Sequence, residues 1–297
     1  MCALAALSGA LGSPAAVAAP ELVERDLHVD GLRLRLVEAG ARDRPPVLLL
    51  HGFMTSSTAL ADLQQRLAER YRVFALDLPG HGQSDRPARP LTGFYLAAAV
   101  GRALEVLELR DVVVVGHSMG ALVAIVLAER WPGRIRSVVA VSPAGFAFDP
   151  LRQVGMRLLA RPAIWAAEPA LVYEIAAHGS VVRFGDGKRA DLEQQLRLRR
   201  DRDWCRCVAS AYRTLATSDL APLARRAKRP IELVFGARDQ ALPPDYRARV
   251  IAALPGAPRL EIEDCGHDVH RDAPEQLIEV IDRARARPHG PPDGARR

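Results

Sequence analysis

Three residues whose side chains could cooperate in catalysis each follow a stretch that predicts a buried strand. Ser118 follows Val112–Val115, Asp239 follows Ile231–Phe235, and His267 follows Leu260–Glu263. A serine hydroxyl is a weak nucleophile that needs a histidine base, which in turn needs a carboxylate to fix its tautomer. Loops that leave the carboxyl ends of parallel strands lie along one edge of a sheet, so the three side chains can converge. The pattern predicts acyl-transfer chemistry at a serine.

The residues around Ser118 make that prediction specific. Four valines lead into Gly116-His117-Ser118-Met119-Gly120, and an apolar helical pattern follows over 121–128. In a strand, sharp turn and helix of this kind, glycines remove the side chains that would collide where strand and helix approach. The serine is then presented at a helix N-terminus, whose positive end favours the negative charge that develops during acyl transfer.

The elements that position these residues alternate between short apolar strands and helices. Strands are predicted at 47–50, 73–76, 112–115, 135–141, 231–235 and 260–263, and helices at 58–70, 94–109, 245–254 and from Pro274 onward. Thr92 is a candidate cap for the second helix. Around Asp30 and Gly31 the alternation of apolar and polar residues predicts a hairpin at the edge of the sheet. The fold class is therefore α/β, with a doubly wound, mostly parallel sheet.

The strand rhythm stops between about residues 144 and 223. Apolar residues recur there at helical spacing, which predicts a helical insertion that would act as a lid over the carboxyl ends of the strands. The predicted organisation is a core at 21–143 and 224–287, a helical lid at 144–223, a leader at 1–20 and a disordered tail at 288–297. The mixed-sign run at 197–203 is interpreted as a solvated helix face.

Five motifs resemble the α/β-hydrolase fold superfamily over most of residues 21–287. They are His51-Gly52-Phe53-Met54, Asp77-Leu78-Pro79-Gly80-His81-Gly82-Gln83-Ser84, the pentapeptide around Ser118, Phe235-Gly236-Ala237-Arg238-Asp239 and Gly266-His267. The chain order Ser, Asp, His is the one found in that superfamily. The resemblance implies that Ser118 is the nucleophile, His267 the general base and then acid, and Asp239 the orienting carboxylate. It also implies an oxyanion hole made by the backbone N–H groups of Phe53 and Met119.

Several neighbouring residues offer alternatives to these assignments. His270 could replace His267 as the base, and Asp264 or Asp268 could hold the histidine, although both are expected to be solvated loop charges. His51 and His81 are expected to pack loops, and Asp77 and Asp85 to hold loop backbone. The side chains predicted to line the substrate pocket are His117, Trp165 and Tyr173.

The type of nucleophile narrows the reaction. Related haloalkane dehalogenases and epoxide hydrolases carry an aspartate at this position, so a serine indicates the esterase- and lipase-like branch. The expected activity is hydrolysis of a small carboxylic ester through an acyl-enzyme. The alternatives are a carbon–carbon bond hydrolase of ring-cleavage products and a non-catalytic binding or accessory module on the same fold.

Composition bears on the other classes of function. The net charge is +6, with Lys188 and Lys228 as the only lysines, and the arginines are interleaved with acidic residues, which indicates a salt-bridged surface. Aromatic residues make up 5% of the chain, too few for the aromatic-lined basic stripe of a nucleic-acid interface, so no nucleic-acid partner is expected. The four cysteines suggest incidental thiols, and no residues show metal-ligand spacing or a phosphate-binding loop. Neither a metal nor another cofactor is expected.

The first twenty residues leave the cellular location open. They are apolar and rich in alanine and leucine, as in a secretory signal, but lack the positive charge that opens such a signal. Gly9, Gly12 and Pro14 interrupt them, so no stable membrane span is expected. The cytoplasm is slightly favoured, export is the alternative, and the sequence does not reveal the oligomeric state.

Overall fold

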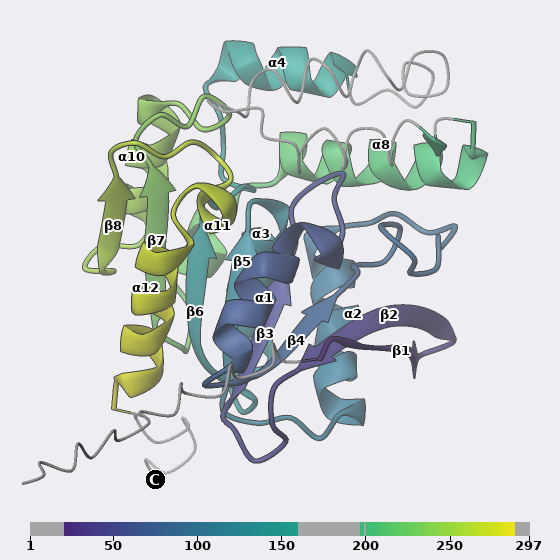
Figure 1. The fold of residues 1–297 in the computed structure, drawn as a ribbon. Helices are drawn as coiled ribbons and strands as arrows, with labels where there is room; N and C mark the ends of the chain where they lie inside the picture. Colours follow the sequence, from purple (N-terminus) through teal and green to yellow (C-terminus); the bar gives the residue numbers. More distant parts are fainter. Residues whose placement is uncertain (1–20, 160–196, 199, 289–297) are drawn as a thin grey trace, which may run out of the picture.

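The computed structural model describes residues 21–159, 197–198 and 200–288, and within them the dominant feature is one eight-stranded sheet. The strands lie in the order β1-β2-β4-β3-β5-β6-β7-β8. β1 and β2 form the predicted antiparallel hairpin at one edge, β2 is antiparallel to β4, and the remaining pairs are parallel. The predicted fold class is confirmed (Figure 1). The strands are β1 (Val23–Val29), β2 (Leu32–Ala39), β3 (Pro46–Leu50), β4 (Arg72–Leu76), β5 (Val112–His117), β6 (Ile135–Val141), β7 (Ile231–Gly236) and β8 (Arg259–Ile262).

Helices cover both faces of the sheet because successive strand residues point to opposite sides. In β3, Leu48 and Leu50 join the core layer beneath α2, α3 and α10, whereas Val47 and Leu49 join the layer beneath α1 and α12. Continuous apolar strands are expected when neither face meets water. The helices of the core are η1 (Ser57–Leu60), α1 (Ala61–Ala68), α2 (Gly93–Val106), α3 (Met119–Arg130), α9 (Ala221–Ala224), α10 (Pro244–Ala253), α11 (Val269–Asp272) and α12 (Pro274–Ala286).

Local signals set several of the helix boundaries. Thr92 caps α2 as predicted, its side chain accepting a hydrogen bond from the Tyr95 N–H at 3.1 Å. Pro274 is the first residue of α12, where its missing N–H costs nothing. The helix predicted over 58–70 is instead a 3₁₀ turn, η1, followed by α1.

Two of the described helices lie wholly within the predicted insertion, while α9 begins at its end, and the two differ in whether their apolar residues are buried. α8 (Arg202–Thr217) packs Trp204 and Val208 against Met54, in the loop after β3. α4 (Pro150–Leu159) lies outside α8 (Figure 1), and Leu151, Val154 and Leu158 remain exposed. These three residues belong to the apolar residues at helical spacing that predicted helices between 144 and 223, and the helix is present here. The division into core and lid stays a prediction, because residues 160–196, like the leader and nearly all of the tail, lie outside the described residues.

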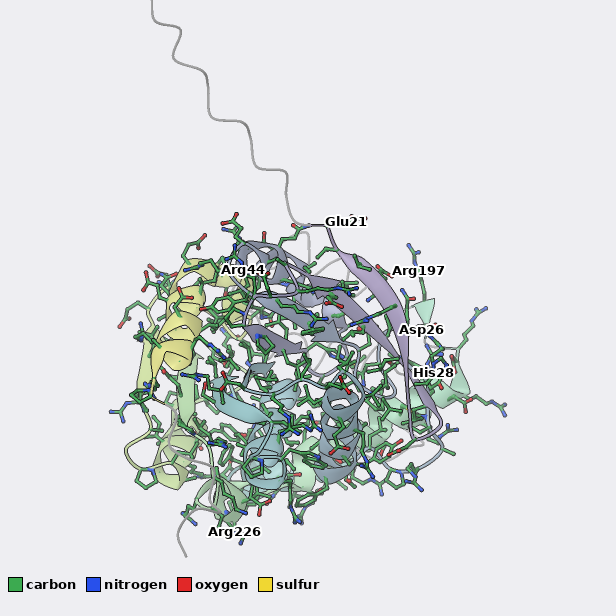
Figure 2. All side chains as sticks on the ribbon, turned by 90° about the horizontal axis from the view of Figure 1, so that it is seen from below. Glu21, Asp26, His28, Arg44, Arg197 and Arg226 are labelled. Carbon is green, nitrogen blue, oxygen red and sulfur yellow. The ribbon has the colours of Figure 1, made fainter. Side chains whose placement is uncertain are left out.

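The surface agrees with the charge pattern of the sequence. Charged side chains of both signs surround the ribbon, with Arg44 and Arg226 at opposite sides (Figure 2). Many arginines pair with carboxylates, among them Arg66 with Glu275 and Arg70 with Asp282, each at 2.6 Å. Such exposed pairs contribute about 0–1 kcal/mol each. None of the helices described is both long and apolar enough to cross a membrane.

The interpretation of 197–203 as a solvated helix face is correct for Arg202 and Asp203, which are exposed in the first turn of α8, but not for Asp201, which precedes the helix. Asp201 is the N-cap of α8, and its side chain accepts hydrogen bonds from the N–H groups of Asp203 and Trp204 at 2.9 and 3.0 Å. The run therefore leads into the helix and supplies its cap. A short polar residue ahead of an apolar helix is the usual signal for such a cap, and here the surrounding charges obscured it.

Candidate active site

Ser118 occupies the turn between β5 and α3 in a backbone conformation that is rare for a serine. Its φ is 52° and its ψ is −109°. A Cβ added to Gly116 would lie 2.3 Å from the Gly120 carbonyl oxygen, and one added to Gly120 would lie 2.2 Å from the Leu50 carbonyl oxygen. Only glycine fits at either place, so the predicted sharp turn is present and Ser118 lies at the first turn of α3.

Hydrogen bonds hold this turn against the neighbouring strand. The Ser118 N–H donates to the Val141 carbonyl at 2.9 Å, and the Ala144 N–H donates to the Ser118 carbonyl at 3.2 Å. The segment after β6 is itself held by the buried Tyr246, whose hydroxyl accepts from the Phe146 N–H at 3.0 Å. Burial raises the pKa of the Tyr246 phenol, so this hydroxyl stays protonated. The backbone of Ser118 is therefore fixed from both sides.

Asp239 and His267 meet at the carboxyl ends of β7 and β8. The Nδ1 atom of His267 lies 2.8 Å from Oδ2 of Asp239. The other carboxylate oxygen, Oδ1, accepts from the N–H groups of Ala241 and Leu242 at 2.9 and 3.0 Å. One oxygen thus fixes the carboxylate while the other faces the imidazole. An ionised carboxylate can only accept, so Nδ1 carries a proton and Nε2 is left as the basic atom.

Close backbone contact places the His267 loop on the end of β7. A Cβ on Gly236 would lie 2.1 Å from the Gly266 carbonyl oxygen and 2.4 Å from that of Cys265. The Gly266 N–H donates to Asp272 Oδ2 at 2.8 Å, which ties the loop to α11. Cys265 is buried, and burial raises the pKa of its thiol to about 12, so it is no nucleophile at neutral pH.

His117, which was predicted to line the pocket, contacts the histidine loop. Its Nε2 atom lies 3.0 Å from the His267 carbonyl oxygen, and the two rings are 4.8 Å apart between centroids. This contact brings His267 beside the residue that precedes Ser118. The pKa of His117 is lowered well below its ordinary value, mainly by burial and then by the nearby His270 and His267. The ring is therefore neutral.

The loops after β3 and β4 are fastened to each other near Ser118. His51 Nε2 accepts from the Leu78 N–H at 3.0 Å, and His51 Nδ1 lies 2.8 Å from the Gly52 carbonyl oxygen. Asp77 accepts from the N–H groups of Ser57 and Gln83 at 2.7 and 2.8 Å. The prediction that His51 and Asp77 hold loops is confirmed, as is that for Asp85, which accepts from the Arg33 N–H at 2.8 Å.

This fastening brings the segment that begins at Gly52 against the nucleophile. A Cβ on Gly52 would lie 3.5 Å from the Cβ of Ser118. Phe53 follows, half-buried, and its ring lies 5.8 Å from that of Tyr212 in α8. Met119 is the first residue of α3, where a helix makes no internal use of its N–H. Both proposed donors of the oxyanion hole thus belong to segments adjacent to Ser118.

The alternative assignments separate clearly in the structure. His270 packs against His117 with ring centroids 4.7 Å apart, whereas the contact of Asp239 is with His267. Asp264 is exposed and pairs with Arg238. Asp268 is not the solvated charge that was expected, because it lies 3.6 Å from His117 Nε2 and its side chain is only 15% exposed.

His117, Asp268 and His270 form a cluster that the sequence did not indicate. One potential metal-ligand atom of each lies within 4.8 Å of the others. His117 is 151 positions from Asp268 and 153 from His270, which is no recognisable ligand spacing, so only the fold could show the cluster. Because a carbonyl oxygen accepts and does not donate, His117 Nε2 must carry the proton in its bond to His267 and cannot bind a metal. The hydrogen bond to His267 therefore already uses one of the potential ligand atoms of this cluster.

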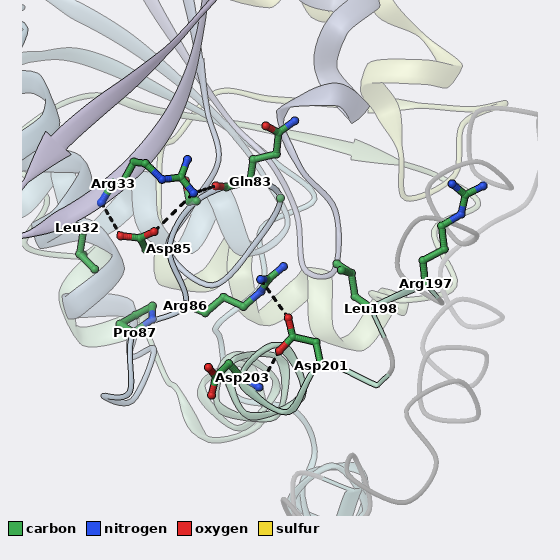
Figure 3. Close-up of a pocket in the computed structure, with 12 residues that line it drawn as sticks. Leu32, Arg33, Gln83, Asp85, Arg86, Pro87, Arg197, Leu198, Asp201 and Asp203 are labelled. Atoms are coloured by element: carbon green, nitrogen blue, oxygen red, sulfur yellow. Dashed lines mark hydrogen bonds and ion pairs between the residues drawn. The ribbon is translucent and has the colours of Figure 1, made fainter.

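A hollow of about 820 Å³ lies near the start of α8, but none of the three predicted catalytic residues lines it. It lies between the loop at 82–87 and the side chains of Arg197, Leu198, Asp201 and Asp203 (Figure 3). Its charges are largely matched, with Arg86 3.1 Å from Asp201 and Arg33 3.6 Å from Asp85. Trp165 and Tyr173 lie outside the described residues, so their predicted place in the substrate pocket stays a prediction.

The comparison with known proteins agrees with this geometry. Residues 47–280 match the model of the alpha/beta hydrolase family. The chain belongs to that family. Hydrolase activity is typical of it, as are a catalytic triad and an oxyanion hole.

Relatives of this chain carry names that indicate different functions. An uncharacterized protein of Mycobacterium tuberculosis is 29% identical over 290 residues, which cover 90% of this chain and 82% of the relative. The magnesium-chelatase 30 kDa subunit of Rhodobacter capsulatus is 30% identical over 83% of this chain and 88% of its own length. The 2-(acetamidomethylene)succinate hydrolase of Mesorhizobium japonicum is 25% identical, with coverages of 89% and 96%.

Solved structures share the fold at lower identity. The enol-lactonase of Burkholderia xenovorans superposes with a TM-score of 0.73 at 23% identity, over 88% of this chain and 99% of its own. A haloalkane dehalogenase of Agrobacterium tumefaciens does so equally well, with a TM-score of 0.73 at 22% identity, over 90% and 97%. A shared fold therefore does not decide between these chemistries, and the side chains of the site must.

Proposed function

We propose that this hydrolase cleaves small carboxylic esters through an acyl-enzyme on Ser118. The proposal is supported by the strained turn at Ser118, because His117, the residue before it, contacts the loop of the His267 that pairs with Asp239. A serine with φ near 52° costs about 1–3 kcal/mol and persists only where the surrounding structure imposes it, and such strain gathers at functional positions. The serine also distinguishes this chain from the aspartate nucleophiles of the dehalogenases that share its fold.

In the proposed reaction His267 moves one proton in each half. Nε2 takes the hydroxyl proton of Ser118 while Oγ attacks the ester carbonyl carbon. The resulting oxyanion is held by the N–H groups of Phe53 and Met119, each worth about 3–4 kcal/mol of barrier lowering. The carbon–oxygen bond to the alcohol then breaks, and His267 gives its proton to the leaving oxygen. Water repeats the sequence on the acyl carbon, releasing the acid and restoring the Ser118 hydroxyl.

Asp239 contributes through the tautomer and the charge of His267. Its oxygen at 2.8 Å keeps the proton on Nδ1, so that Nε2 is unprotonated and can act as the base. When Nε2 takes up a proton, the same carboxylate stabilises the imidazolium. The two backbone N–H bonds to its other oxygen keep this carboxylate in place during the cycle.

Turnover of p-nitrophenyl acetate and butyrate by wild type and Ser118→Ala tests the proposal. Wild type is expected to release nitrophenolate and to be labelled at Ser118 by a fluorophosphonate, with the labelled peptide found by mass spectrometry. Ser118→Ala should fall to the uncatalysed rate and take no label. Equal rates for the two proteins would remove the serine mechanism.

A second candidate function is an accessory role without turnover. It is favoured by the 30% identity to a protein named as a magnesium-chelatase subunit. Under this alternative, wild type would resist the fluorophosphonate as fully as Ser118→Ala. Intact pairing of Asp239 and His267 favours the catalytic proposal, because an accessory role places no demand on the protonation of a histidine.

A further inference from the structure

His117 contacts three parts of the site without having a part in the proposed reaction. It is joined by a peptide bond to Ser118, its Nε2 lies 3.0 Å from the His267 carbonyl oxygen, and its Nδ1 would lie 2.8 Å from a Cβ on Gly52. The side chain therefore touches the turn of the nucleophile, the loop of the histidine and the segment that leads to Phe53. Only 6% of the residue is exposed, so its ring is enclosed by these parts of the site.

The chemistry of the contact fixes the state of the ring. A backbone carbonyl accepts hydrogen bonds and does not donate them, so Nε2–H is the donor. The groups that surround the ring are His267, Asp268 and His270. They enclose it on the side of the loop after β8, while Gly52 lies against Nδ1. The ring consequently has no room to turn away from the His267 carbonyl.

We propose that His117 is a positioning residue that holds the main chain of His267 at a set distance from Ser118. The Asp239 contact orients the imidazole but acts on the ring alone. The His117 hydrogen bond acts on the backbone of the same residue and connects it to the turn of the nucleophile. Together they fix both ends of the His267 side chain. This inference rests on the proposed serine mechanism, in which an error of about 1 Å can cost about 100-fold in rate.

Three substitutions distinguish positioning from other roles of His117. His117→Leu keeps much of the volume but removes the donor, and His117→Asn keeps a donor on a shorter side chain. His117→Gln carries an amide N–H that can reach the His267 carbonyl. We expect Leu and Asn to lower kcat and the rate of fluorophosphonate labelling by about 10- to 100-fold with KM within about twofold. Gln should recover the wild-type rate to within about fivefold.

A second readout needs no turnover. In crystal structures, the His267 main chain should move away from the turn in His117→Leu and remain in place in His117→Gln. If His117→Leu does not fold, the comparison of Asn with Gln carries the same contrast. Unchanged labelling in all variants with an unmoved His267 would overturn the inference, as would a change in KM between acetate and butyrate at constant kcat. Absence of labelling in wild type would instead reject the serine mechanism, and the crystal structures would still decide the positioning role.

Discussion

Two pairs of buried histidines lie in the loops and strand ends around Ser118 and differ in what their ring nitrogens contact. His51 and His81, after β3 and β4, contact backbone groups, as in the 3.2 Å contact from His81 Nδ1 to the Pro79 carbonyl. In the other pair, His117 also contacts a backbone carbonyl, but His267 faces the carboxylate of Asp239. A backbone partner fixes a neutral ring in one tautomer, whereas a carboxylate also supports the protonated form. The chemical difference between these histidines therefore lies in their partners, since all four are buried.

The largest effect expected from this comparison follows from changing the partner of His267. Asp239→Asn can donate to Nδ1 and so stabilises the wrong tautomer, with the proton on Nε2. We expect kcat for p-nitrophenyl butyrate to fall by about 10,000-fold with little change in the fold. Steady-state kinetics measure the loss, and thermal unfolding provides the control. A loss of kcat below tenfold would show that the carboxylate partner is not what makes His267 the base.

In the other pair the corresponding change should weaken the fold. His51→Ala leaves the buried Leu78 N–H without its acceptor and opens a cavity, so the free energy of unfolding should fall by about 2–4 kcal/mol. Urea unfolding measures this change. Thr55→Ala is the matched control, because it removes a half-buried hydroxyl that donates to the same Gly52 carbonyl. Its cost should stay below about 1 kcal/mol, and equal costs would contradict the structural role of His51.

His81 should make the protein sensitive to acid. Burial, followed by the proximity of His51, lowers its pKa to about 3 from an ordinary value of 6.5. The unfolded chain therefore binds the proton first, and stability that is present above pH 6.5 is lost as the pH falls toward 3. For this group the loss between pH 7 and pH 5 is about 2 kcal/mol.

Urea unfolding of wild type and His81→Gln at the two pH values isolates that contribution. The variant should lose about 2 kcal/mol less than wild type between pH 7 and pH 5, because glutamine does not titrate there. Other groups titrate equally in both proteins, so the difference belongs to residue 81. Parallel losses would mean that the folded state accommodates the charged ring.

The smallest effect is expected at His270. It lies in the same cluster as His117 but does not hold the Asp239 contact, so His270→Gln should lower kcat by less than tenfold. The same ester assay measures it beside His267→Gln, which should lose nearly all activity. A larger loss at His270 than at His267 would reverse the assignment of the base and remove the distinction between the two pairs.

Much of this site could be predicted because its residues follow apolar strands, which are covered by helices on both faces of the sheet. Val112–Val115 and Ile231–Phe235 fixed the places of Ser118 and Asp239, since parallel strands end at one edge. The partner of His117 could not be predicted in this way. Its hydrogen bond joins residues 150 positions apart through a backbone atom, and backbone carbonyls have no signature in the sequence.

The same limit explains the misjudged surface residues. Asp268 was expected in solvent because a charged residue in a loop usually is, but α11 begins directly after it and turns it toward His117. In α4, helical spacing revealed the helix without revealing whether its apolar residues would be covered. Leu151 is 83% exposed. The spacing of apolar residues indicates a helix, whereas their burial depends on whether another element packs against them.

The two glycines that flank the nucleophile have a consequence for anyone who would alter the selectivity of this protein. With a carbonyl oxygen 2.2–2.3 Å from any added Cβ, a library that randomises positions 116 and 120 should yield almost no folded members. Met119, 1% exposed, offers little more freedom. Substitutions that leave the protein folded should therefore be sought in α8, among the side chains that face the loop of Phe53, such as Tyr212. The turn around Ser118 therefore tolerates almost no substitution, and we expect changes in substrate selectivity to come from substitutions in α8.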